Sequence, residues 1–226
     1  LNAQDAELNT PLILAATNGQ NDAVGFLLDA GADLGKADQK GRIALHHAAK
    51  GNYQEIVALL LKSNTIDVNA RTVDGETALL LAVEKGHGKI VLTLLDKSDP
   101  DVTGTSKKSA LWHCCTHGLE ECVAKLISKG ANVNGEQSPL IQAAKAGHYG
   151  IVKMILEKDV RVDDRDPLGR TALMWASQRG HLEIVKLLVE TGKANVLAED
   201  ATFDTALTIA TWNQREEIVE YLAPLS

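Results

Sequence analysis

The residues best suited to chemistry lie close together between positions 113 and 122. They are His113, Cys114, Cys115, His117 and Cys122. Imidazole and thiolate groups are common ligands of zinc, and a thiolate can also act as a nucleophile. Cysteine can equally serve as a small apolar residue in a helix. The stretch therefore raises three alternatives: a metal site, thiol chemistry, or ordinary packing.

The composition of the whole chain limits the classes of function. The 226 residues are 45% hydrophobic but only 4% aromatic, which favours helices rich in alanine and leucine over a sandwich or barrel. The net charge of −7 argues against a nucleic-acid surface, which needs a basic face. No apolar run approaches the ~20 residues of a membrane span, and no signal peptide is visible. An odd number of cysteines, two of them adjacent, argues against a disulfide framework. We therefore expect an intracellular protein, cytoplasmic or nuclear.

The chain contains seven copies of one pattern. The copies start at positions 10, 43, 77, 109, 138, 171 and 205. Most begin with a threonine or serine that suits a helix N-cap, followed by proline or alanine. A pair of small residues and a helix-ending glycine come next, and then a second apolar stripe of the form IVxxLL. One such helix pair cannot bury its own apolar face, so neighbouring copies must stack.

These copies resemble the ankyrin-repeat family along nearly the whole chain. The segments DPLGRTAL at 166–173 and TALMWASQRGHLEIVKLLVETGKANV at 171–196 lie close to the family pattern. The resemblance implies an all-α fold: a solenoid of stacked helix-turn-helix units with short hairpin-like fingers. We predict a single ankyrin-repeat domain over 1–226, a monomer, and part of a larger protein. Its approximate repeat units are 5–37, 38–71, 72–103, 104–134, 135–165, 166–199 and 200–226.

The repeat register decides among the three alternatives at 113–122. Cys114 and Cys115 take the places of the small-residue pair, and Cys122 takes the place of an isoleucine in other copies. All three should therefore be buried as small apolar residues, with His113 partly buried and His117 facing solvent. No phosphate-binding loop, HExxH or GxSxG motif occurs. We predict no enzymatic activity, no metal and no cofactor. Metal-dependent or thiol chemistry at 113–122 remains the alternative.

The resemblance implies a non-enzymatic module that binds another protein or a peptide on its concave face. Family members contact partners with the finger tips and the exposed face of the first helices. Carried onto this sequence, the partner-binding positions are Arg42, Lys85, His117, Lys145, Arg170, Gln178, Arg179, Trp212 and Asn213.

Two features of this surface leave alternatives open. Trp212 replaces polar residues of other copies, so it is either a binding anchor or a cap over the end of the stack. Lys85, Lys145, Arg170 and Arg179 form either a basic stripe, which would suit an acidic partner, or a set of solvated charges.

Three departures from the repeat pattern predict local differences. Ile43 replaces the capping hydroxyl, which predicts a weaker helix start. The stretch 96–109 lacks the family's turn and predicts a looser surface loop. The fourth and fifth copies are separated by only 29 residues, which predicts a blunt finger. A small-ligand or peptide sensor at this finger, 134–138, is a further alternative.

Overall fold

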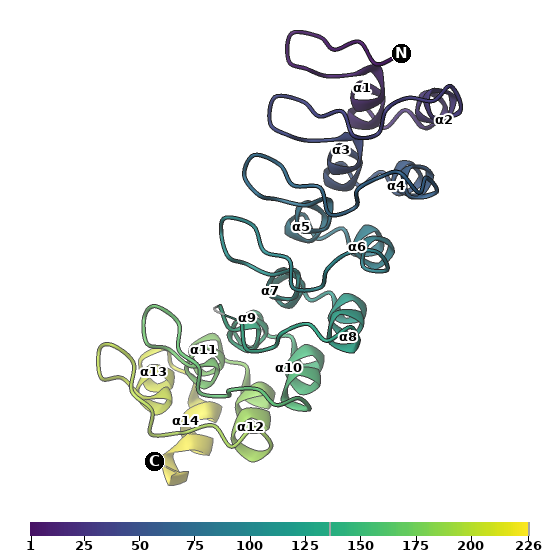
Figure 1. Cartoon of the computed structure of the whole chain (residues 1–226). Helices are drawn as coiled ribbons and strands as arrows, with labels where there is room; N and C mark the ends of the chain where they lie inside the picture. The colour runs from purple at the N-terminus through teal and green to yellow at the C-terminus, as the bar shows by residue number, and fades with distance from the viewer. Residues whose placement is uncertain (136, 226) are drawn as a thin grey trace. The chain divides into compact units, whose positions relative to one another are not determined.

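The computed structural model describes residues 1–135 and 137–225 and shows an all-helical chain (Figure 1). Fourteen α-helices and one 3-10 helix occur in these residues, and the only β pairing in them is an isolated bridge. The predicted fold class is thus confirmed. The chain divides into two compact units, Leu1–His113 and Cys114–Ser226, and each is described by itself. The single domain over 1–226 stays a prediction.

Each copy of the sequence pattern forms one pair of short helices. The first unit contains α1 (Pro11–Thr17), α2 (Asn21–Asp29), α3 (Ala44–Lys50), α4 (Gln54–Leu61), α5 (Ala78–Glu84) and α6 (Gly88–Leu94). Helix α7 (Ala110–His117) begins in the first unit and ends in the second. The second unit continues with α8 (Glu120–Ser128), α9 (Pro139–Ala146), α10 (Tyr149–Leu156), α11 (Ala172–Arg179), α12 (Leu182–Glu190), α13 (Ala206–Trp212), α14 (Glu216–Leu222) and the 3-10 helix η1 (Ala223–Leu225). In the part of the chain described, no helix is long and apolar enough to cross a membrane.

Hydroxyl caps start most of the first helices, as the sequence predicts. The threonine hydroxyl accepts a hydrogen bond from the amide three residues later at Thr10, Thr77, Thr171 and Thr205. Ser109 does the same for the amide of Trp112 at 3.2 Å. The prediction is wrong at Ser138, whose side chain makes no capping bond. Its backbone (φ −44°, ψ 113°) departs from the extended geometry of Thr10 (φ −89°, ψ 164°), which aims the capping hydroxyl at the first turn.

Helix α3 begins without a hydroxyl cap, and a buried histidine partly replaces it. Ile43 has no side-chain acceptor, but the Nδ1 atom of His46 accepts the amide proton of Ile43 at 3.2 Å. The opposite ring atom, Nε2, then donates to the carbonyl of Ala70 at 3.0 Å. Burial lowers the pKa of His46, which fits the neutral ring that this pair of bonds requires. His46 therefore has a structural role.

The helix pairs of each unit share one continuous hydrophobic core, and no pair has a separate core of its own. In the first unit, α1, α3 and α5 contact one another in turn, as do α2, α4 and α6. In the second unit the same holds for α9, α11 and α13 and for α8, α10, α12 and α14. The leucine that follows proline or alanine in the first helix is fully buried, as in Leu45, Leu79 and Leu140. Nearest-neighbour stacking of this kind positions the first helices side by side.

The fingers between helix pairs are tight turns whose ends are joined by backbone hydrogen bonds. At residues 38–42, the amide of Asp38 donates to the carbonyl of Arg42 at 3.0 Å, and Gly41 adopts a positive φ of 71°. A Cβ atom at Gly41 would lie 3.0 Å from the amide nitrogen of Val73 in the next finger. Glycine is therefore required there for both its φ angle and the close approach.

The stretch 96–109 is more regular than its sequence suggests. Thr103 and Ser109 form an antiparallel bridge, and the amide of Lys107 donates to the carbonyl of Gly104 at 3.1 Å. Lys107 adopts a positive φ of 57°, a conformation that glycine takes in other fingers. The prediction of a looser loop is thus wrong, because a lysine accepts the left-handed conformation that closes the turn.

Candidate functional site

The base of the finger at 38–42 holds a small ionic network, here called the Asp38 cluster (Asp38, Arg42 and His47). The Oδ2 atom of Asp38 accepts from Arg42 Nε at 2.9 Å and Nη2 at 2.8 Å, and lies 3.0 Å from His47 Nε2. Burial alone would raise the pKa of Asp38, but hydrogen bonds from Arg42, His47 and the Lys40 amide lower it to about 2. The carboxylate therefore stays ionised. Arg42, predicted to contact a partner, is held inside this network.

The corresponding finger of the second unit has a different centre, here called the Trp175 cluster (Lys145, Asp166, Arg170 and Trp175). Trp175 stands in α11 at the place that His47 has in α3. Its indole Nε1 donates to Asp166 Oδ2 at 2.8 Å. Two cations lie over its ring, with Lys145 Nζ at 3.8 Å and Arg170 Cζ at 5.2 Å from the ring centroid. Trp175 is buried and forms a cation–π contact with both.

Arg170 connects this cluster to the next finger. Its Nε atom lies 3.1 Å from Asp200 Oδ2, and its Nη1 atom donates to Gln178 Oε1 at 3.2 Å. Burial of Asp200 would raise its pKa, but bonds from Thr202, the Asp204 amide and Arg170 lower it to about 2. The carboxylates of Asp166 and Asp200 are therefore both engaged within the protein.

Exposed apolar side chains lie on the two fingers of the second unit and on α13. Leu168 is 55% exposed, Phe203 79% and Trp212 72%. Trp212 thus covers little of the protein surface, which does not fit the cap alternative. Phe203 was not among the predicted positions. It takes the place of Gly169 in the finger pattern and has a positive φ of 62°. A phenylalanine at a glycine position was the signal in the sequence.

The remaining predicted contact residues lie in different settings. Lys85 pairs with its neighbour Glu84 at 3.5 Å in the first unit. His117 and Arg179 are exposed at the ends of α7 and α11. Asn213 is partly buried, and its amide donates to the carbonyl of Ile209 at 2.8 Å. Lys145 and Arg170 belong to the Trp175 cluster, and Gln178 accepts a hydrogen bond from Arg170. Arg42 and Lys85 belong to the other unit.

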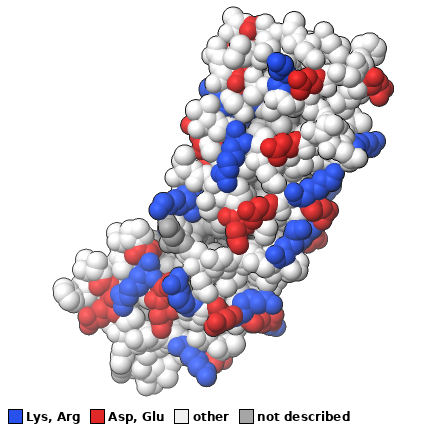
Figure 2. Space-filling view, viewed as in Figure 1, with Lys and Arg blue, Asp and Glu red and all other residues white. Residues whose placement is uncertain are grey.

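The distribution of charge is mixed. Figure 2 shows Lys and Arg interspersed with Asp and Glu on the face in view, without a large field of one sign. Among the described residues, no acidic side chain forms an ion pair with Lys145 or Arg179. Local cations, rather than a long basic stripe, are therefore the electrostatic feature of the second unit.

The stretch 113–122 packs as the repeat register predicts. Cys114, Cys115 and Cys122 are buried and reduced, His113 is half-buried and His117 is exposed. The pKa of the Cys114 thiol is raised by its hydrogen bond with Cys122 and by burial, and burial raises the pKa of Cys115. Both groups are therefore poor nucleophiles at neutral pH. Within residues 1–135 and 137–225, no three His, Cys, Asp or Glu side chains are grouped to hold a metal ion.

Two other places differ from the clusters: the short finger at 134–138 and a groove in the first unit. The proposed sensor at 134–138 includes Glu136, which lies outside the described residues. The Asn134 side-chain amide donates to the Asp159 carbonyl at 2.7 Å, and its Oδ1 accepts the Arg161 amide proton at 2.8 Å. Both polar atoms of this side chain therefore bind the next loop.

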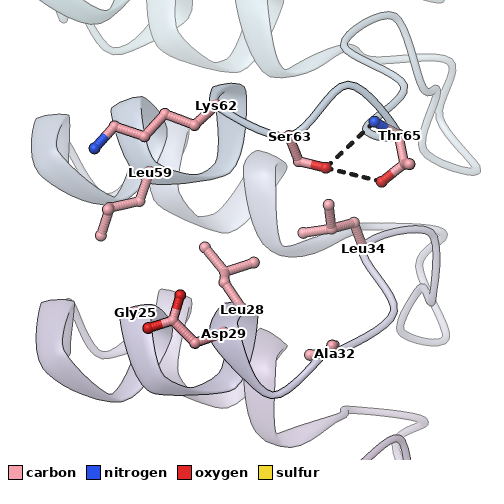
Figure 3. Close-up of a pocket in the computed structure, with 10 residues that line it drawn as sticks. Gly25, Leu28, Asp29, Ala32, Leu34, Leu59, Lys62, Ser63 and Thr65 are labelled. Carbon is pink, nitrogen blue, oxygen red and sulfur yellow. Dashed lines mark hydrogen bonds between the residues drawn. The ribbon is translucent and has the colours of Figure 1, made fainter.

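An open groove of about 570 Å³ lies in the first unit beside α2 and α4 (Figure 3). Its wall combines Leu28 and Leu59 with a polar rim and contains no group of catalytic residues.

Comparisons with known proteins agree with the repeat architecture. A family model described as ankyrin repeats matches three times, at residues 12–106, 97–166 and 140–225. The chain belongs to the ankyrin-repeat family. Proteins built from ankyrin repeats are generally protein–protein interaction modules, and such domains are typically non-enzymatic.

Relatives of this ankyrin-repeat chain include much longer proteins. A transient receptor potential cation channel subfamily A member 1 homolog of Caenorhabditis elegans is 29% identical over 195 residues, which cover 84% of this chain and 16% of the channel. The chain therefore spans a minor part of that relative. Two solved ankyrin repeat domains are similar in structure, each at 26% identity. The Bcl-3 domain covers 95% of this chain and 98% of its own length with a TM-score of 0.74. The human ASB11 domain covers 93% and 98% with a TM-score of 0.79.

Proposed function

We propose that this ankyrin-repeat chain is a recognition module that binds another protein through the finger-side face of its second unit. This face consists of the fingers at 166–170 and 200–204 and the exposed side of α9, α11 and α13. It corresponds to the concave face of the family. The observation that carries the proposal is the exposure of Phe203 and Trp212 in the same unit as Lys145 and Arg179, which form no ion pair among the described residues. Aromatic and arginine side chains are the residue types most often found as hot spots of interfaces.

The chemistry of the chain supports binding rather than catalysis. Burial and hydrogen bonding raise the pKa values of the Cys114 and Cys115 thiols, whereas the hydrogen bond with Cys114 lowers the pKa of Cys122 inside the core. The ionised carboxylates of Asp38 and Asp200 accept internal hydrogen bonds. Neither set is available to transfer protons or attack a substrate. The aromatic rings of Phe203 and Trp212, in contrast, keep most of their surface exposed to solvent.

A capture experiment with paired variants tests the location of the site. The chain is compared with the double variant Trp212→Ala/Arg179→Ala and with the matched control Phe26→Ala/Lys50→Ala. Phe26 is as exposed as Trp212, at 72%, and Lys50 is an exposed cation of α3 in the first unit. We expect the first pair to lose a partner from a lysate of the source cells and the control to retain it. Circular dichroism confirms that both variants fold. Retention of every partner by the first pair would contradict the proposal.

A further inference from the structure

Three neighbouring helices of the second unit present a row of side chains with different chemistry. Lys145, Gln178 and Trp212 occupy the same place near the ends of α9, α11 and α13. Helix α11 contacts both α9 and α13. Neighbouring helix axes in proteins are separated by about 10 Å, so the row extends over about 20 Å. One end of the row is cationic and the other is aromatic.

At the cationic end, none of the described residues supplies an anion that pairs with Lys145. Lys145 Nζ lies 3.8 Å from the centroid of the Trp175 ring, which orients the ammonium group without neutralising it. The nearby carboxylates already have partners: Asp166 accepts a hydrogen bond from the Trp175 indole, and Asp200 pairs with Arg170. Arg179 lies one residue beyond Gln178, on α11, and also lacks an ion pair among the described residues.

The aromatic end shows two signs of a binding surface. Trp212 is 72% exposed and Phe203 79% exposed, although burial is the ordinary state of such large rings. Phe203 also holds a positive φ of 62°, which is unfavourable for a bulky side chain. Where a strained backbone conformation is retained, the strain often serves a functional site. Here it presents the ring to solvent on a finger tip.

We propose that this row binds an extended acidic segment of a partner protein that also carries a large apolar side chain. Carboxylates of the segment pair with Lys145 and Arg179, and the apolar side chain packs against Trp212 and Phe203. An extended chain rises about 3.3 Å per residue, so about six residues separate the two features. The inference rests on the proposed function and specifies the chemistry of the partner.

The net charge of −7 opposes an acidic partner only at long range. Charges in physiological salt are screened over about 8 Å, so the cations in direct contact dominate the local interaction. The affinity should therefore decrease as salt is added, because the contacts are partly exposed to solvent. The polar Gln178 side chain, which accepts from Arg170, separates the two ends of the row.

Synthetic peptides test this partner chemistry on the full 226-residue chain. The probes are ten-residue peptides with leucine at one end and two glutamates six residues away, in both chain directions. Isothermal titration calorimetry measures their affinity. We expect Lys145→Ala to weaken binding about tenfold and Trp212→Ala about 30-fold. The matched controls Lys50→Ala and Phe26→Ala should bind as the unmodified chain does.

A charge exchange makes the test specific. The variant Lys145→Glu should lose the glutamate peptides and gain binding to the same peptides with lysine in place of glutamate. Equal binding of a glutamine-substituted peptide, or equal losses in the Lys50→Ala control, would overturn the proposal. Failure of both glutamate peptides to bind would also overturn it. In that case the capture experiment still decides the proposed function, because it does not depend on the chemistry of the partner.

Discussion

The Asp38 cluster and the Trp175 cluster are built on the same places of the repeat but behave differently. Both begin with an aspartate at the finger base and an arginine four residues later. In the first, Arg42 and His47 share the Oδ2 atom of Asp38. In the second, the Trp175 indole takes the corresponding oxygen of Asp166, and Arg170 reaches the next finger instead.

This difference depends on two places in the repeat: the helix residue, His47 or Trp175, and the first residue of the next finger, Thr72 or Asp200. His47 is a titratable side chain inside a closed network, so its finger is stabilised locally. Trp175 offers a ring face to Lys145 and Arg170 and connects two fingers through Arg170. The first arrangement adds a titratable histidine to the carboxylate, whereas the second holds Lys145 and Arg170 over the indole ring.

The largest expected difference concerns the two central side chains. Trp175→Ala should destabilise the chain by about 3–5 kcal/mol, because it removes a large buried ring. His47→Ala should cost only about 1–2 kcal/mol, since it removes mainly one hydrogen bond to a charged group. Urea unfolding followed by circular dichroism measures both. Trp212→Ala, at an exposed position, should change the stability by less than about 0.5 kcal/mol. Equal losses from Trp175→Ala and His47→Ala would refute the comparison.

Acid should affect Asp38 in the first unit and Asp200, the partner of Arg170, in the second. The pKa of Asp38 is lowered from 3.8 to about 2 in the folded state, and so is that of Asp200. A depressed folded-state pKa contributes stability above pH 3.8, which is lost as the pH falls from about 4 to about 2. The change corresponds to about 2 kcal/mol at each site. Unfolding measurements across this range should show a smaller decrease for Asp38→Asn and for Asp200→Asn. An unchanged pH profile in either variant would show that the carboxylate is not responsible.

The smallest expected effect separates the two clusters near neutral pH. Burial, together with the charges of Arg42 and Lys50, lowers the pKa of His47 below 6.5, although Asp38 opposes the shift. Protonation then favours the unfolded chain, so stability should decrease as the pH falls through and below 6.5. The variant His47→Gln should lose less stability between pH 7 and 5. Some pH dependence should persist, because the pKa of His46 is lowered as well. Trp175→Phe, which removes no titratable group, should keep the slope of the unmodified chain.

Much of the fold could be predicted because each repeat carries its own local signals. Threonine caps, helix-ending glycines and paired apolar stripes act over a few residues, and their recurrence makes the stacked arrangement the only way to bury the stripes. The burial of Cys114, Cys115 and Cys122 followed from the same register. Predictions were wrong at Ser138 and in the loop 96–109, where the backbone geometry of a shortened or glycine-poor finger decided the outcome.

The candidate site was less predictable than the fold. The sequence indicated Lys145, Arg170, Gln178 and Trp212 by position alone. It did not indicate that Asp166 and Asp200 are occupied, because those bonds join residues 9 and 30 positions apart. Phe203 was missed because its place at a glycine position, the one signal in the sequence, does not show that the ring is exposed until the finger geometry is known.

The sequence by itself determined the repeat, the helix pairs and the burial of the cysteines, since these depend on local capping, glycine turns and apolar periodicity. Only the tertiary structure decided which charges are available to a partner. Hydrogen bonds between neighbouring fingers and helices engage some charged groups. Others, such as Lys145, are oriented by a ring but form no ion pair among the described residues. This selection depends on distances of a few ångströms between residues far apart in the chain, which no local pattern encodes.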